Sequence, residues 1–553
     1  MDDLRVSGGR IVSVATGEIW AADVIVHNGI IVELIEPHEK RSVRSEVFAQ
    51  DSLIVPGFID AHVHIESSML VPSTFAEATL RHGTTTILAD PHEIVNVAGA
   101  EALRWMIREG DKTQQSMFWA VPSCVPSLDG LETAGAVLTA EMIDDLLSLP
   151  GVIALGEVMD YRAVVGDHSR MRDILRIARD HDVIIDGHCP NLDGYDLQRY
   201  LRAGISSDHC KNNPKPFIEK LRLGMTLMLQ EKSFTAEVVS AYKQLPFAPD
   251  VCIVTDDIAA DVIAEHGHLD HIARVALAAG MPALAVLRAI TINPAQRLRL
   301  RDRGVIAPGH RADLVFLSDL ETFTVTDVIA GGAPLSSQPP TQSAFQGSVH
   351  LNPEMCVDEV VWSLDLPDGD YSFRAIRVNP IDTSTQEDRI VLPVRNGRVE
   401  WFGLCAVVTV IERHTGSGRV THAPVIGMQL SLGAVCTTYA HDSHNVTIIG
   451  TSENHMREAL SRVISADGGI MVSAETGNAG LELPIGGVMT PAPLNDVAYG
   501  TAHIRDALEK WGWRHRIPFM SISTLTLPAS PDIKISDYGL IDVHKRALVS
   551  PVV

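Results

Sequence analysis

The segment Pro56-Gly-Phe-Ile-Asp-Ala-His-Val-His64 places two histidines one residue apart at the end of an apolar run. On a β-strand, residues i and i+2 point to the same side, so His62 and His64 can present their imidazoles to one point. Neutral imidazole is a common metal ligand, and this spacing supplies half of a metal site without distorting the strand. Because the chain has 23 histidines, such a pair can also arise by chance, and the rest of the sequence decides its meaning.

The composition is typical of a cytoplasmic globular protein. The 553 residues exceed what one hydrophobic core can organise, so we expect two or three domains. Asp and Glu number 69 against 45 Lys and Arg, and the net charge of −24 argues against nucleic acid or an anionic membrane as a partner. The seven cysteines form no Cys-x-x-Cys pair, which favours the reducing cytoplasm over a disulfide framework. We expect no secretory leader and no membrane-spanning segment.

From residue 56 onward, short β-branched runs alternate with amphipathic segments such as 171–179, 214–223 and 236–245. Eight such runs predict strands at Phe58–His64, Thr84–Asp90, Met117–Pro122, Val152–Val158, Val183–His188, Gly204–His209, Met225–Gln230 and Val251–Asp256. Eight βα repeats predict an α/β fold, a (β/α)8 TIM-like barrel. A doubly wound open sheet is the alternative, but neither glycine-rich phosphate-binding pattern stands where that fold would need it.

Residues able to bind a metal or move a proton stand at the ends of most predicted strands. In barrel enzymes, these carboxyl ends form the active site. Each residue taken alone is also compatible with a cap or a satisfied core polar group, but a barrel would bring them all together. They are His62, His64, Asp90, His92, Glu157, His188, His209 and Asp256.

This arrangement resembles the amidohydrolase superfamily, with His-x-His on strand 1, a carboxylate on strand 4, histidines on strands 5 and 6, and Asp on strand 8. Within it the chain is similar to the adenine deaminase family at Glu66–Met69, Ala89–Ile94, Gly187–Pro190, Gly267–His271, Thr291–Ala295 and Tyr439–Val446. The stretch Gly304–Leu317 resembles the return strand of the superfamily's small β-domain. The resemblance implies a small β-domain from residues 1–55 and 303–345, a metal-dependent barrel over 56–302, and a C-terminal α+β domain over 346–553.

Four histidines and two carboxylates are the right number of ligands for two divalent cations, Mn²⁺, Fe²⁺ or Zn²⁺. The first cation is assigned to His62, His64 and Asp256. The second is assigned to His188 and His209. Glu157 would bridge the two, where many superfamily members use a carboxylated lysine.

The predicted reaction is the hydrolytic deamination of adenine to hypoxanthine and ammonia. Asp256 is expected to take a proton from the attacking water and hand it to the departing ammonia. The predicted catalytic set is Asp256, Glu157, His209, Asp90 and His92, of which the last two, with Glu93 and Glu66, are candidates for protonating the purine ring. His441, Asp442, His444 and Asn445 resemble family residues and would either reach over the barrel mouth as a lid or form a local turn.

Departures from the family pattern at Cys210, Ile258 and Gln230–Ser233 spare the predicted ligands and leave the substrate open. The alternative function is that of another amidohydrolase, acting on a different aminopurine, a cyclic amide or an N-acyl amino acid. A non-catalytic scaffold would have no reason to keep six ligands. The predicted partner is a small-molecule purine, and an enzyme of this size is expected to form a homo-oligomer, a dimer.

Overall fold

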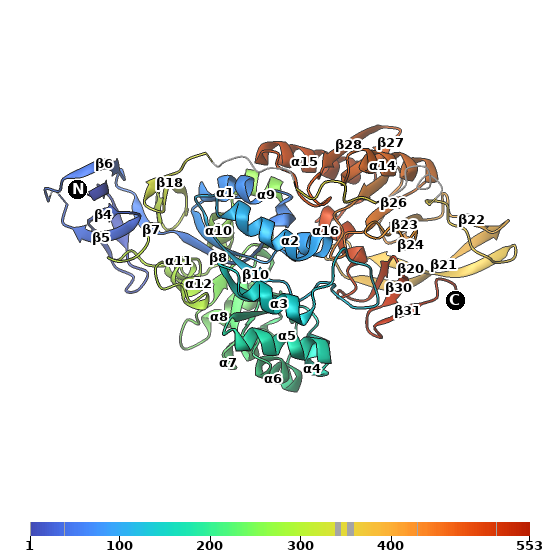
Figure 1. Cartoon of the computed structure of the whole chain (residues 1–553), viewed down its shortest axis with the longest axis horizontal. Helices are drawn as coiled ribbons and strands as arrows, with labels where there is room; N and C mark the ends of the chain where they lie inside the picture. The colour runs from blue at the N-terminus through green and yellow to red at the C-terminus, as the bar shows by residue number, and fades with distance from the viewer. Residues whose placement is uncertain (1, 38, 338–343, 351–358, 429, 516) are drawn as a thin grey trace.

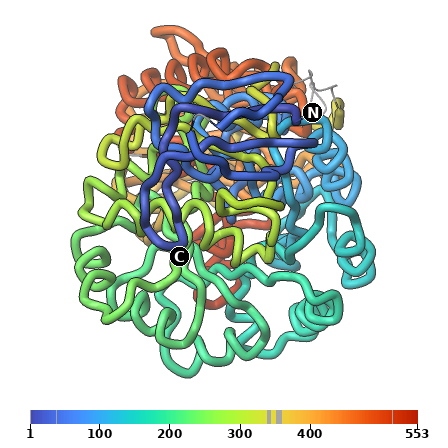
Figure 2. Tube along the Cα trace, turned by 90° about the vertical axis from the view of Figure 1, so that its left-hand side faces the viewer, coloured from blue at the N-terminus to red at the C-terminus, as the bar shows by residue number. Residues whose placement is uncertain are grey.

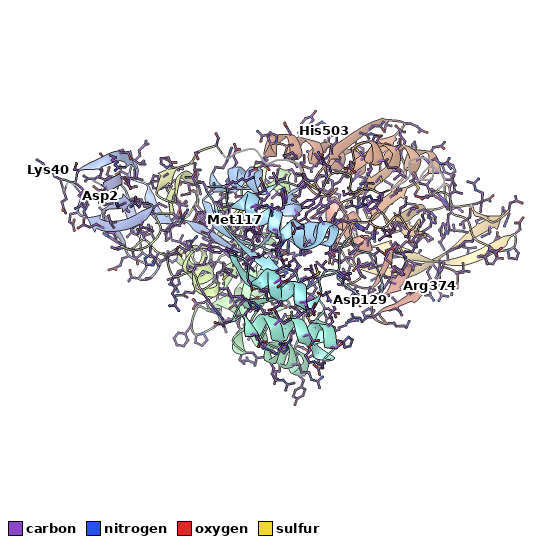
Figure 3. All side chains as sticks on the ribbon, viewed as in Figure 1. Asp2, Lys40, Met117, Asp129, Arg374 and His503 are labelled. Carbon is purple, nitrogen blue, oxygen red and sulfur yellow. The ribbon has the colours of Figure 1, made fainter. Side chains whose placement is uncertain are left out.

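The computed structural model describes residues 2–37, 39–337, 344–350, 359–428, 430–515 and 517–553. Residues 338–343 and 351–358, on either side of the predicted boundary between 345 and 346, lie outside the described residues. Figure 1 shows an elongated molecule with the N-terminal strands at one end, the barrel in the middle and the C-terminal sheets at the other end. Figure 3 marks this axis, with Asp2 and Lys40 at one end and Arg374 towards the other.

Two small sheets lie beside the barrel (Figure 2), and one of them joins the two flanks of the barrel sequence. The first sheet has the order β5 (Ile30–Ile35), β4 (Asp23–His27), β1 (Asp2–Ser7) and β6 (Val43–Phe48). The second has the order β19 (Ala333–Pro334), β18 (Val325–Ala330), β17 (Leu314–Leu317), β7 (Leu53–Pro56), β2 (Arg10–Val12) and β3 (Ile19–Ala21). In this sheet β17 runs antiparallel to β7, with Val315 opposite Val55. The chain therefore leaves the barrel beside the strand by which it enters.

Within residues 56–302, all of which the structure describes, two sheets of parallel strands together form a barrel. They follow one another as β8 (Phe58–His64), β9 (Thr84–Ala89), β10 (Ser116–Val121), β11 (Val152–Val158), β12 (Ile184–Gly187), β13 (Ser207–Asp208), β14 (Thr226–Leu229), β15 (Cys252–Ile253) and β16 (Asp256–Asp257). β15 and β16 are two halves of the eighth strand, and β16 brings this strand back to the first by pairing with β8, Asp256 opposite Val63. The predicted TIM-like barrel is confirmed.

Helices connect the strands and cover the outside of the barrel. In α5 (Ser169–Asp180) the buried residues Met171, Ile174, Leu175 and Ala178 follow the spacing of one helical face, which packs inward. This helix, α7 (Pro214–Arg222) and α8 (Ala236–Lys243) lie within two residues of their predicted bounds. Other helices of this layer are α1 (Pro72–Leu80), α2 (His92–Gly110), α3 (Ala140–Leu147), α6 (Gly194–Arg202) and α10 (Leu269–Ala278).

The C-terminal part is an α+β structure built on one large sheet. Its strands have the order β22 (Arg398–Val399), β21 (Thr385–Arg395), β20 (Gly369–Val378), β24 (Val420–Ile426), β23 (Ala406–Ile411), β26 (Val446–Gly450), β25 (Ala434–Thr437), β27 (Gly469–Ala474) and β28 (Gly477–Glu482). Helices α14 (Glu453–Ser465) and α15 (Leu494–Lys510) pack against it.

The C-terminal part packs directly onto the barrel. One hydrophobic cluster contains both Ile94 of α2 and Ile485 of the C-terminal part. The helix α15 contacts α9 (Ala260–His266), where Arg505 forms an ion pair with Asp261. Among the described residues, no helix is both long and apolar enough to cross a membrane.

Candidate metal centre

The two histidines of β8 point to one side of the strand, as their spacing predicts, and both are buried. Their Nε2 atoms approach the same carboxylate oxygen on β16. His62 Nε2 lies 3.5 Å and His64 Nε2 lies 3.2 Å from Asp256 Oδ1. These donor atoms are close enough together to hold one cation.

Glu157, near the end of β11, faces histidines on two sides. Its Oε2 atom lies 2.6 Å from His188 Nδ1 and 3.1 Å from His209 Nε2. Its Oε1 atom lies 3.4 Å from His64 Nε2. The structure therefore brings all six predicted ligands together at the carboxyl ends of the strands, with the two oxygens of Glu157 directed at different histidine groups.

The backbone at Asp256 is unusual and breaks the eighth strand. Its φ of 57° lies in the left-handed region, which few residues other than glycine adopt and which is common at functional sites. As a result Asp256 is buried among the histidines, whereas Asp257 is exposed and accepts a hydrogen bond of 2.5 Å from Ser67 Oγ. These neighbouring carboxylates therefore point in different directions.

Asp90 orients two of the candidate ligands. The Nδ1 atom of His64 lies 2.8 Å from the Asp90 carbonyl oxygen, so this nitrogen carries the proton and Nε2 is left as the free donor. The Asp90 side chain accepts the backbone N–H of Glu157 at 2.8 Å. His92, at the start of α2, is also buried here, with Nδ1 3.8 Å from Glu157 Oε1. Asp90 and His92 therefore both lie next to the candidate metal ligands.

Three further residues support the ligands and were missed by sequence reasoning as parts of the site. Asp186 Oδ2 lies 3.5 Å from His62 Nδ1, and Arg297 holds its other oxygen at 2.7 Å. Gln230 donates to Asp256 Oδ2 at 2.5 Å and to the His209 carbonyl at 3.0 Å. Asp186 could have been found from the sequence, because it stands two residues before His188 in the same predicted strand, Val183–His188.

The charges of the centre fit a divalent cation. Burial alone would raise the pKa values of Glu157 and Asp256, but the surrounding imidazoles outweigh it and hold both pKa values well below their usual range. Among the described residues, none forms a hydrogen bond with either ring nitrogen of His62 or with His209 Nδ1. Buried anionic oxygens beside unpaired imidazole nitrogens form the mixed donor set that Mn²⁺, Fe²⁺ and Zn²⁺ accept.

Comparison with known proteins identifies the family. Residues 53–335 match the amidohydrolase family, and residues 382–547 match the adenine deaminase C-terminal domain. "Adenine deaminase 2" of Shouchella clausii is 38% identical, covering 99% of this chain and 98% of that protein. The chain belongs to the adenine deaminase family. Adenine deaminases of Clostridium perfringens (34% identical, 96% of this chain and 95% of that protein) and Methanothermobacter thermautotrophicus (36%, 97% and 98%) are similar over comparable lengths. The predicted family is confirmed, and the chain is a metal-dependent hydrolase.

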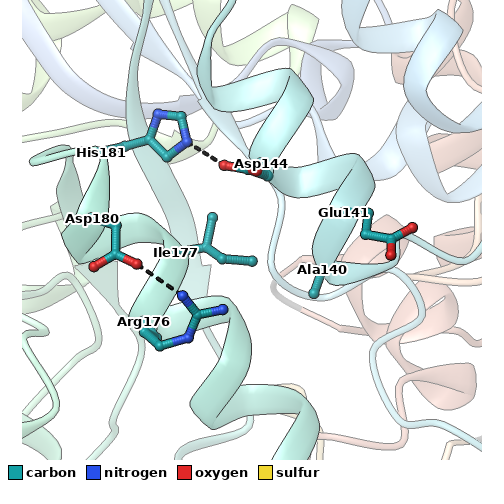
Figure 4. A pocket seen from close by; sticks show the side chains of 7 residues that line it. All are labelled: Ala140, Glu141, Asp144, Arg176, Ile177, Asp180 and His181. Carbon is teal, nitrogen blue, oxygen red and sulfur yellow. Dashed lines mark hydrogen bonds and ion pairs between the residues drawn. The ribbon is translucent and has the colours of Figure 1, made fainter.

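A separate hollow of about 350 Å³ lies on the outside of the barrel between α3 and α5 (Figure 4). It is lined by two ion pairs, His181 with Asp144 and Arg176 with Asp180. Arg176 and Asp180 are four residues apart on one helix and both well exposed, so this pair contributes about 0–1 kcal/mol at most. The hollow contains none of the strand-end residues.

Gly156 gives a direct test of the support that Asp90 provides. A methyl group at position 156 would lie 2.4 Å from Asp90 Oδ2, the atom that accepts the Glu157 N–H. We expect Gly156→Ala to displace Asp90 and to weaken metal binding about 10- to 100-fold, the usual cost of losing a residue that orients ligands. Metal titration of the purified protein measures this.

The control for this variant is Gly500→Ala on α15, where the added methyl would lie 3.3 Å from a flexible Leu481 side chain. Metal affinity of that variant should stay at the wild-type value. If Gly156→Ala binds metal as tightly as the control, Asp90 does not position the centre.

Proposed function

We propose that the protein hydrolyses adenine to hypoxanthine and ammonia, using two divalent cations at the ends of the barrel strands. The observation that carries this proposal is the position of Glu157, whose oxygens face His64 on one side and His188 and His209 on the other. One carboxylate placed in this way can bridge two cations. The similarity to adenine deaminases over nearly the whole chain supports adenine as the substrate.

In this proposal His62, His64 and Asp256 bind the first cation, and His188 and His209 bind the second. Two divalent cations bridged by Glu157 would lower the pKa of water and so make it a nucleophile near neutral pH. The glutamate carries its own charge, so the centre needs no bicarbonate to carboxylate a lysine. The mixed nitrogen and oxygen ligands are compatible with Mn²⁺, Fe²⁺ or Zn²⁺.

Asp256 is the proposed proton carrier. Its Oδ1 atom faces the β8 histidines, and its Oδ2 atom accepts a hydrogen bond from Gln230, which fixes the plane of the carboxylate. From this position it would take a proton from the water that attacks C6 of the purine and deliver it to the amino group that leaves as ammonia. Glu157 and His209 act as ligands, and Asp90 and His92 position them.

The substrate is tested by assaying manganese-loaded protein against adenine, other aminopurines, hydantoins and N-acyl amino acids. Ammonia and hypoxanthine are measured together. We expect adenine to give equal amounts of both and the cyclic amides to give no product. Hydrolysis of a hydantoin or an acyl amino acid with adenine untouched would replace the proposed reaction by the alternative amidohydrolase activity.

The variants Asp256→Asn and Asp257→Asn each remove one negative charge at the end of strand 8. Comparing them separates the loss of proton transfer from the loss of a charge alone. Asp256→Asn keeps the shape and an oxygen ligand but loses the basic oxygen, so turnover should fall about 10²- to 10⁴-fold while most metal is retained. Asp257→Asn changes an exposed side chain that contacts Ser67 and should stay within a few-fold of wild type. Turnover and metal content are measured for both. An inactive Asp257→Asn variant beside a nearly normal Asp256→Asn variant would show that the proton carrier is Asp257 and that the proposed role of Asp256 is wrong.

Glu157→Gln tests the bridge. A neutral amide cannot balance the charge of two cations, so this variant should lose metal and activity together, whereas bicarbonate should leave the wild-type rate unchanged. Elemental analysis and turnover are measured with and without added bicarbonate. Stimulation of the wild type by bicarbonate would point to a carboxylated lysine and contradict the bridging role of Glu157.

We further propose that the enzyme works in the cytoplasm as a homodimer. The first point is supported by six described cysteines without a disulfide, five of which are buried. Light scattering would give twice the 60.0 kDa of the chain for the dimer and 60.0 kDa for a monomer.

A further inference from the structure

A second cluster of buried ligand-type side chains lies beside the metal centre, where the C-terminal part meets α2. His92 and Glu93 stand at the start of α2, and His441 and Asp442 stand in the loop between β25 and β26. All four are at least 97% buried. One donor atom from each lies within 4.8 Å of the donor atoms of the other three.

The donor atoms of this cluster face one another. Glu93 Oε1 lies 3.4 Å from His92 Nε2 and contacts His441 Nδ1. His441 Nδ1 in turn lies 3.7 Å from Asp442 Oδ1. Two imidazoles and two carboxylates around one point are a ligand set that Zn²⁺, Mn²⁺ and Fe²⁺ accept in proteins.

One carboxylate oxygen of the cluster has no partner. Among the residues that the structure describes, nothing hydrogen-bonds to Asp442 Oδ2, although this side chain is 98% buried. Glu93 Oε1, in contrast, faces the imidazole nitrogens of His92 and His441. Leaving a buried carboxylate oxygen unpaired is costly, and a cation beside it would remove that cost.

His444 prepares Glu93 for this role. Its Nδ1 atom accepts the backbone N–H of Ala440 at 3.1 Å, so the ring proton is on Nε2. That Nε2–H donates to Glu93 Oε2 at 2.5 Å. One oxygen of Glu93 is thereby fixed by a hydrogen bond while the other is directed at His92 and His441, and such outer hydrogen bonds are usual for a carboxylate that binds a metal.

We propose that His92, Glu93, His441 and Asp442 bind a third divalent cation, which joins the C-terminal part to the mouth of the barrel. Two carboxylates and two neutral imidazoles balance the charge of such an ion. The site uses none of the six ligands of the strand-end centre, and it does not depend on adenine being the substrate. Its ligands come from both parts of the chain, so binding would also hold those parts together.

The first test is the metal content of the full-length protein after loading with Mn²⁺ and removal of unbound ion. We expect about three Mn²⁺ per chain in the wild type and about two in His441→Ala and in Asp442→Asn. The control is His503→Ala, because His503 is an exposed histidine on α15 (Figure 3) outside the cluster. It should keep three. Equal metal content in all four proteins would overturn the proposal.

The second test needs no variant and so is independent of whether the variants fold. Crystals of the manganese-loaded wild type are measured for anomalous scattering. A peak between His92 and His441, in addition to two at the strand ends, is expected. Two strand-end peaks without the third would overturn this inference and leave the proposed function intact. A peak in the cluster without strand-end peaks would support the third site and overturn the proposed two-cation centre.

Discussion

Two carboxylates, Glu157 and Asp256, are buried close together at the carboxyl ends of the barrel strands. The rest of the site depends on stabilising these two negative charges. Both side chains are nearly inaccessible to water, and their charges repel each other. The imidazoles around them stabilise the ionised forms, because each carboxylate lies within contact distance of at least two histidines. The same arrangement concentrates negative charge where a cation would bind most strongly. Binding of a cation would therefore lower the electrostatic free energy of this site.

The barrel supplies the geometry, since parallel strands deliver their last residues to one place. β16 pairs with β8, which sets Asp256 beside the two histidines of the first strand. The left-handed backbone of Asp256 then turns its carboxylate inward. A surrounding layer of polar side chains holds the ligands in their orientations, notably Asp90, Asp186 and Gln230. The C-terminal part adds to this layer through His441 and His444, which contact Glu93 of α2, so it is a structural component of the barrel mouth.

The sequence predicts the barrel well where local patterns determine it. The first five strands lie within one residue of their predicted bounds, because each is a short run rich in apolar and β-branched residues. The sixth strand is shorter than predicted, and the eighth is split in two. The split follows from the positive φ of Asp256, which no periodicity reveals. The spacing of two residues between His62 and His64 predicts that both imidazoles lie on one side of the strand. The pairings of Gln230 with Asp256 and of Glu93 with His441 are not, because each joins residues that are distant in the sequence and meet only in the folded chain.

In the proposed mechanism, deamination requires more than one cation at the strand ends. The most direct measurement removes all metal with a chelator, adds Mn²⁺ back in known equivalents, and follows hypoxanthine formation from adenine at each step. We predict no turnover without metal and full turnover only above one equivalent of Mn²⁺ per chain. Full turnover of the metal-free protein, or at one equivalent or less, would contradict it.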